Sequence, residues 1–97
     1  MDVLGRDITY RYVLPVSMPA RTVDPLSSVP VYRQVAAILR ERIESGELEP
    51  DRPVPSEAHL VQEYGIARGT ARRAIEVLRD EGLVVTVHGR GTYVKPR

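Results

Sequence analysis

Residues 67–75 read ARGTARRAI, and the interpretation of the whole chain starts from this stretch. Its apolar residues, continued by Leu78, recur at spacings of three, four and seven, which places Ala71, Ala74 and Ile75 on one face of a helix. Three arginines lie in or near the first two turns of that helix. Positive side chains at a helix N-terminus oppose the helix dipole, so the arrangement favours an external anion as partner. A phosphate backbone is the obvious candidate.

Length and composition exclude several classes of protein. A chain of 97 residues supports one small domain with a modest core. The sequence has no cysteine and only two histidines, His59 and His88, so we predict no metal site and no cofactor. It shows no pairing of nucleophile and base and no phosphate-binding loop, so we predict that the protein is not an enzyme. No apolar run approaches the roughly 20 residues of a membrane span, and no signal peptide is recognised, which predicts a soluble cytoplasmic protein.

Charge is distributed unevenly along the sequence, although the formal net charge is only +1. Residues 40–64 hold three arginines against seven acidic residues, a balance of −4. Residues 65–97 hold seven lysines or arginines against three acidic residues, a balance of +4. A basic end beside an acidic middle suits a module that presents one side to the phosphates of a duplex.

Residues 1–28 differ from the rest of the chain and are predicted to form an N-terminal arm and linker. Residues 8–14 alternate as a strand does, and several prolines follow. A lone strand is not stable by itself, which leaves three alternatives: it adds to a sheet elsewhere, pairs with a second copy of the chain, or stays disordered.

From residue 31 the hydrophobic period becomes helical. A first helix is predicted from the stripe Val31, Val35, Ile38, Leu39 and Ile43, with a stop at Ser45 and Gly46. A short second helix is predicted to begin after Ser56, which is placed as its N-cap, and to end at Gly65. Ala67 then opens the third helix without a capping side chain.

The third helix is predicted to run to about Glu81, with Gly82 ending it. Two β-branched runs follow, residues 83–87 and 92–95, separated by His88-Gly89-Arg90-Gly91. This pattern predicts a hairpin with a glycine-rich basic tip. The order of three helices and a hairpin predicts a mainly α fold of the winged helix-turn-helix class.

The motifs themselves resemble a known family. The segments PVYRQVAAILRERIESGELEP, VPSEAHLVQEYGIARGTARRAIEVLRDEGLV and HGRGTYV resemble the GntR-type winged helix-turn-helix domain of bacterial transcription regulators. The resemblance covers residues 29–97, with the helix-turn-helix at 57–76 and the wing at 83–95. It implies that the third helix enters the major groove of DNA and that the hairpin tip reaches the neighbouring minor groove.

The resemblance also implies DNA-binding roles for individual residues. It places Arg68 and Arg72 at base edges or adjacent phosphates, Thr70 at a phosphate, and the wing tip at the minor groove. Arginine can bond guanine bidentately, threonine can bond a phosphate oxygen, and glycine permits close backbone approach. The predicted DNA-binding residues are Ser56, Arg68, Gly69, Thr70, Arg72, Arg73, His88, Gly89 and Arg90.

Each of these residues also has a simpler interpretation. The arginines can form a solvated helix face with ion pairs such as Arg72 with Glu76, and Arg73 in particular can face solvent. His88 can be an exposed turn histidine, and Ser56 can serve only as a helix cap. The sequence also departs from the family at Ala67, where serine or threonine is usual.

We therefore expect a sequence-specific regulator, a repressor by analogy with the family, which binds a near-palindromic double-stranded operator as a homodimer. Its half-sites would lie about 10 to 10.5 base pairs apart. The strand at residues 8–14 is a candidate for dimerisation, because no effector-binding or dimerising domain is visible in this chain. The alternative is a winged-helix protein-interaction module whose basic helix meets an acidic protein.

Overall fold

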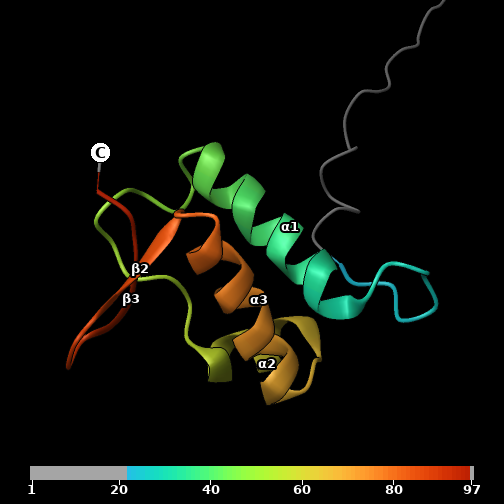
Figure 1. Ribbon diagram of the computed structural model, residues 1–97. Helices are drawn as coiled ribbons and strands as arrows, with labels where there is room; N and C mark the ends of the chain where they lie inside the picture. The colour runs from blue at the N-terminus through green and yellow to red at the C-terminus, as the bar shows by residue number, and fades with distance from the viewer. Residues whose placement is uncertain (1–21, 97) are drawn as a thin grey trace, which may run out of the picture.

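Three helices precede a two-stranded antiparallel hairpin, which confirms the predicted winged helix-turn-helix class (Figure 1). The computed structural model describes residues 22–96. The elements are α1 (Val31–Glu44), α2 (Glu57–Tyr64), α3 (Arg68–Asp80), β2 (Val84–Val87) and β3 (Gly91–Val94). The strand predicted at residues 8–14 lies outside the described residues.

Helix α1 packs its apolar stripe against α3 (Figure 1). Four members of the predicted stripe are buried, whereas Val31, in the first turn, is half-buried against the edge of the core. The helix ends as predicted, because Gly46 adopts a left-handed φ of 89° just after it. Ahead of α1, the Gln34 side-chain amide bonds both the N–H and the carbonyl of Asp24, at 2.7 and 2.9 Å, and so attaches residues 22–30 to the helix.

The turn between α2 and α3 depends on two end residues. The Ser56 hydroxyl accepts a hydrogen bond from the His59 N–H at 3.1 Å, as predicted for an N-cap. Gly65 ends α2 in the left-handed conformation, with φ 66°, which turns the chain sharply. Ile66 then packs into the core, and Ala67 begins α3 with no side-chain cap. The two helices of the motif are held by this short turn.

Helix α3 supplies the centre of the core. All four predicted apolar residues are buried, and Ala71 and Ala74 are fully inaccessible, so small side chains let the neighbouring helices approach closely. The helix ends at Asp80, one residue before the predicted end, because Glu81 is already the C-cap and Gly82 turns the chain at φ 77°.

The end of α3 is tied to α1 by a bidentate ion pair. The Arg40 guanidinium donates two hydrogen bonds to the Glu81 carboxylate, at 2.8 and 2.6 Å. These hydrogen bonds hold the pKa of Glu81 below its ordinary value of 4.5 and raise the pKa of Arg40. The C-terminal end of α3 is thus fixed to the core by a side-chain contact as well as by packing.

The wing pairs Val84 with Val94 and Val87 with Gly91. β2 begins one residue later than predicted, and β3 begins and ends one residue earlier than predicted. Leu83 donates its N–H to the Leu78 carbonyl and so belongs to the turn after α3, and Gly91 joins β3 at φ 114°, a conformation that suits glycine. The loop between α1 and α2 also pairs with β3, through an isolated antiparallel β-bridge between Pro53 and Tyr93.

Candidate nucleic-acid interface

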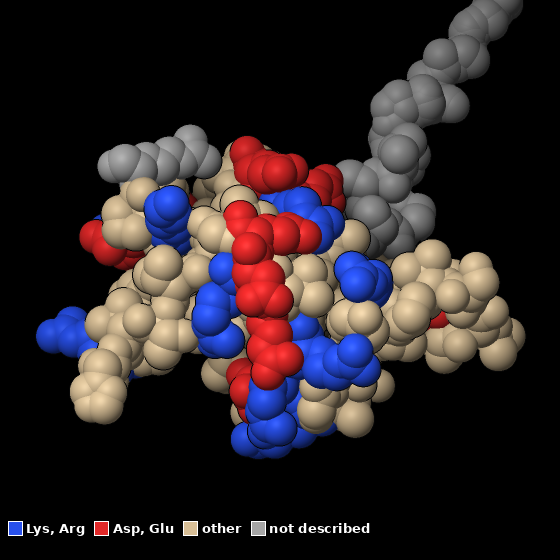
Figure 2. Space-filling model, viewed as in Figure 1, with Lys and Arg blue, Asp and Glu red and all other residues tan. Residues whose placement is uncertain are grey.

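The solvent face of α3 carries only basic charges on its first two turns and mixed charges further along, where Arg79 is exposed among acidic residues. Arg68, Arg72 and Arg73 are exposed on the first two turns, whereas Glu76 and Asp80 are exposed further along. In the space-filling view, acidic side chains form a band that runs from the C-terminal end of α1 down over α3, and basic side chains flank this band and gather below it, near α2 and the start of α3 (Figure 2). The basic surface is therefore concentrated at the N-terminal end of α3.

Glu57 organises two of the arginines. It lies in the first turn of α2, and its carboxylate is 3.5 Å from the Arg72 Nε and 4.0 Å from the Arg68 Nη1. Arg72 therefore turns to Glu57 on the preceding helix rather than to Glu76, the partner predicted from helical spacing. Because these separations are long and the three side chains are one-third or more exposed, the contacts orient the guanidinium groups without sequestering them.

The side chain of Arg73 extends from the other side of α3 and lies over the ring of Tyr32, with its guanidinium carbon 4.0 Å from the ring centroid. Tyr32 is in the first turn of α1 and half-buried, and Arg33 approaches the same ring at 5.3 Å. The aromatic face attracts the cation and limits its motion. Arg73 is therefore exposed, as one interpretation of the sequence expected, but its guanidinium also contacts the Tyr32 ring on α1.

The remaining predicted residues lie at the start of α2 and at the wing tip. Ser56 is exposed beside Glu57 and already caps α2. His88, Gly89 and Arg90 form the turn between β2 and β3, all exposed, with Gly89 left-handed at φ 75°. Gly69 and Thr70 lie in the first turn of α3.

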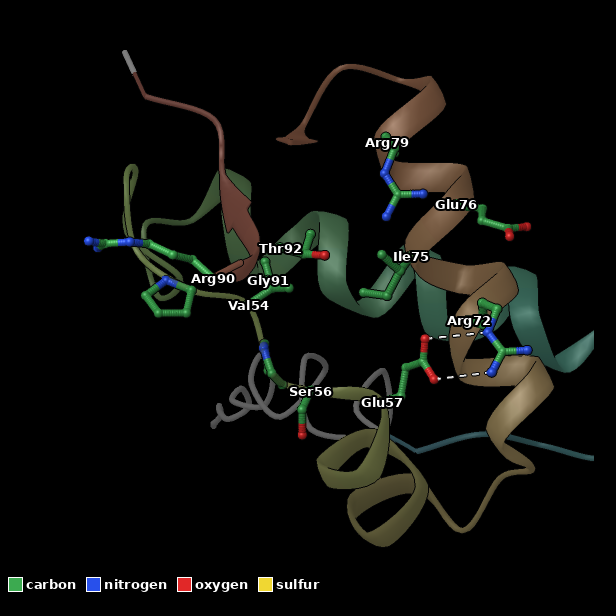
Figure 3. A pocket seen from close by; sticks show the side chains of 12 residues that line it. Val54, Ser56, Glu57, Arg72, Ile75, Glu76, Arg79, Arg90, Gly91 and Thr92 are labelled. Carbon is green, nitrogen blue, oxygen red and sulfur yellow. Dashed lines mark hydrogen bonds and ion pairs between the residues drawn. The ribbon is translucent and has the colours of Figure 1, made fainter. Parts of the chain in front are cut away.

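A groove of about 410 Å³ separates α3 from the wing (Figure 3). The predicted residues Ser56, Arg72 and Arg90 all line it, so the fold brings the start of α2, the exposed side of α3 and the wing to one surface. Arg73 is outside this groove, on the side of α3 that meets α1. The other lining residues are Pro53, Val54, Pro55, Glu57, Ile75, Glu76, Arg79, Gly91 and Thr92.

Sequence reasoning overlooked four residues on these surfaces: Glu57, Tyr32, Arg79 and Thr92. For Arg79 the sequence did carry a signal, because it lies seven residues after Arg72 and so on the same side of the helix. Glu57 and Tyr32 meet α3 across the tertiary fold, at sequence separations that no helical period relates. Thr92 falls at the start of a predicted strand, where nothing in the local pattern marks it.

Within residues 22–96, no cluster of three or more histidine or acidic side chains is arranged to hold a metal ion. None of the helices in that part of the chain has the length and apolar character needed to cross a membrane.

Comparison with known proteins matches this fold to characterised relatives. The model of the family "Bacterial regulatory proteins, gntR family" matches residues 31–94. The chain is 44% identical over 72 residues to the HTH-type transcriptional repressor NagR of Bacillus subtilis, covering 73% of this chain and 30% of that protein. It is 42% identical over 66 residues to the mannosyl-D-glycerate transport/metabolism system repressor MngR of Escherichia coli, covering 68% of this chain and 28% of that protein.

A solved structure of similar fold contains DNA. The structure of AraR(DBD) in complex with operator ORX1 superposes with a TM-score of 0.69 at 38% sequence identity, covering 75% of this chain and 93% of that chain. The present chain thus spans about a third of the length of the two curated relatives, and most of the length of the DNA-bound AraR domain.

Proposed function

The chain belongs to the gntR family of bacterial regulatory proteins, and we propose that it is a sequence-specific double-stranded DNA-binding regulator of transcription that acts as a repressor. The observation that carries the proposal is the arginine-bearing end of α3, presented beside a wing on a fold similar to the AraR domain bound to its operator. The relatives named above are themselves transcriptional repressors.

Helix α3 is the element that enters the major groove. Arg68 and Arg72 are exposed at its start, and each guanidinium can donate two parallel hydrogen bonds to the O6 and N7 atoms of guanine. Glu57 holds both side chains near one another before DNA arrives, which reduces the conformational entropy lost on binding. Because its contacts are long, Glu57 can release either arginine to a base at small cost.

Phosphate contacts position α3 on the duplex. Thr70 and Ser56 offer hydroxyl groups near the same end of the motif, and Arg73 offers a guanidinium held over Tyr32. Gly69 has no side chain, and the space that a Cβ would occupy is open, so the backbone there can approach DNA closely. These contacts fix the register of the protein but carry no sequence information.

The wing tip reaches the neighbouring minor groove. The side chain of Arg90 extends from the turn away from α3, and its neighbours His88 and Gly89 are exposed (Figure 3). Arginine inserted into a narrow minor groove responds to its negative potential and so reads the shape of the DNA. The wing would therefore add a preference for A·T-rich flanks to the direct readout by α3.

Two copies of the chain would place their α3 helices in successive major grooves of a near-palindromic operator. The half-site centres would then lie about 10 to 10.5 base pairs apart, or a multiple of that spacing. The working protein is a cytoplasmic homodimer in this proposal.

Selection of bound duplexes from a random pool tests the proposal directly. A recovered motif with two inverted half-sites supports sequence-specific recognition by a dimer, and a pool with no enriched motif contradicts it. The protein-interaction alternative is separated by Arg68→Ala, which should weaken duplex binding steeply and in a salt-dependent manner if DNA is the partner. If the wild-type chain shows no salt-sensitive duplex binding at moderate ionic strength, the DNA proposal fails.

A further inference from the structure

We propose that Arg79 is a phosphate contact of this chain, and that it binds the sugar–phosphate strand that must pass between α3 and the wing when these two elements enter neighbouring grooves. This inference rests on the function proposed above. Neighbouring major and minor grooves of a duplex share one strand as a wall, so a protein that enters both grooves must accommodate that strand between its two elements. The groove occupies that position on this chain.

Arg79 is the first observation that supports this assignment. It stands among acidic residues on the second half of α3, with Glu76 before it and Asp80 and Glu81 after it. Within residues 22–96 it has no hydrogen-bond or ion-pair partner, although acidic side chains surround it in the sequence. Its side chain extends from α3 on the side that faces the wing, whereas the side chain of Glu76, which also lines the groove, points away from the wing (Figure 3). An unpaired guanidinium beside a groove is suited to an anion supplied from outside.

The position of Arg79 relative to Arg72 gives the second observation. Seven residues correspond to about two turns, so Arg79 lies on the same side of α3 and about 10 Å further along its axis. That separation is about three base-pair steps of a single DNA strand. Arg72 can thus reach a base edge while Arg79 meets the backbone further along, which is the division between specifying and positioning contacts seen in DNA-binding proteins.

The opposite wall of the groove supplies hydroxyl donors rather than carboxylates. Thr92 directs its hydroxyl group toward α3 from β3, and Ser56 lies at the lower end of the same groove (Figure 3). Two acidic residues, Glu57 and Glu76, also line the groove, and the Glu57 carboxylate lies 3.5 Å from the Arg72 Nε in the free chain. The groove thus offers donors from Arg79 and Thr92, and the lining residues Val54 and Ile75 add apolar surface that suits the deoxyribose rings.

A salt series of duplex affinities for the full chain tests this assignment. Two probes are used: the operator duplex selected for the wild-type chain, and a mixed-sequence B-form duplex. Each phosphate contact contributes about −0.9 to the slope of log K against log salt. Arg79→Ala should therefore reduce the magnitude of the slope by about 0.9 and weaken binding to both probes by a similar factor, roughly tenfold. Arg79→Lys should keep the wild-type slope, because it keeps the charge.

Two further variants serve as controls. Lys95→Ala removes the same charge from an exposed residue outside the groove and should leave slope and affinity unchanged. Thr92→Val removes only a hydroxyl group, so it should weaken both probes a few-fold without changing the slope. Circular dichroism checks that each variant is folded.

The outcomes separate this inference from the proposed function. A wild-type slope in Arg79→Ala overturns the phosphate assignment while the DNA-binding proposal stands. A loss confined to the operator probe, with the mixed-sequence duplex unaffected, also overturns it, because Arg79 would then read a base. Absence of salt-dependent binding in the wild-type chain overturns the proposed function itself.

Discussion

The two ends of α3 are built differently. The C-terminal end is fixed to α1 by the bidentate contact of Arg40 with Glu81, and Gly82 then turns the chain into the wing. The N-terminal end begins at Ala67 with no capping side chain, has a glycine in its first turn and carries no acidic residue there. The N-terminal end therefore has backbone N–H groups without a side-chain cap beside exposed arginines, which suits an external anion. The contrast supports the proposal that the N-terminal end of α3 contacts DNA.

The largest expected effect is that of Arg72→Ala on DNA binding. Loss of a bidentate base contact should cost about 1–3 kcal/mol, or roughly five- to 150-fold in affinity for the selected operator. The free energy of unfolding should change by less than about 0.5 kcal/mol, because the side chain is exposed and its contacts with Glu57 are long. Fluorescence anisotropy and urea unfolding measure the two quantities.

The matched control for this change is Lys95→Ala, which removes one positive charge from an exposed residue outside the groove between α3 and the wing. An equal loss of affinity in both variants would show that Arg72 acts only through net charge. Equal weakening on every duplex sequence would place Arg72 at a phosphate instead of a base.

A capping side chain at position 67, where α3 begins, should change the free energy of unfolding and the affinity for DNA in different ways. Ala67 already has the extended backbone of an N-cap, with φ −73° and ψ 153°. Ala67→Asp and Ala67→Ser should each raise the free energy of unfolding by about 1 kcal/mol. The aspartate also adds a negative charge where phosphates are expected, so only Ala67→Asp should weaken duplex binding. Equal affinities in the two variants would mean that no phosphate approaches this end.

Local sequence patterns predicted the helices because each depends on neighbours within one or two turns. The apolar stripe of α3, the Ser56 cap and the left-handed Gly65 all follow from short spacings, and the structure has all three. The ends of the strands were predicted less accurately, because Gly91 joins β3 at φ 114°, a conformation that suits glycine but that a β-branched pattern does not indicate.

The partners of the arginines could not be predicted in the same way. Arg72 contacts Glu57, 15 residues away, and Arg73 contacts Tyr32 on α1. Each contact is created when helices pack together, so it depends on interhelical geometry that hydrophobic period does not specify. The sequence identified which residues to consider at the surface, and the tertiary fold determined which of them share a groove.

Gly69→Ala should have a smaller effect, on the stability of the first turn of α3. Open space surrounds the position of a Cβ there, so alanine should stabilise α3 by up to about 1 kcal/mol. In the free wild-type chain, amides of residues 68–70 should exchange faster than in the DNA complex, and Gly69→Ala should slow them without DNA. Hydrogen exchange read by NMR measures both effects. Equal rates in free and bound protein would show that the helix start is already fully ordered.

The smallest expected effect is on the free energy of unfolding, through the ion pair of Glu81 with Arg40 at the C-terminal end of α3. Its pKa is lower in the folded state than in the unfolded chain, so the ion pair with Arg40 contributes stability above about pH 4.5 and loses it as the pH falls through the folded-state value. At neutral pH, Glu81→Gln should therefore lower the free energy of unfolding, by less than about 1 kcal/mol because both side chains are about one-third exposed. The difference from wild type should vanish in acid, where both chains carry a neutral group.

Denaturant unfolding at neutral and at acid pH measures this difference, with Glu76→Gln as the control for an exposed carboxylate on the same helix. A difference that persists in acid would assign the effect of Glu81 to packing rather than to charge, and the fixed end of α3 would then not depend on its ion pair.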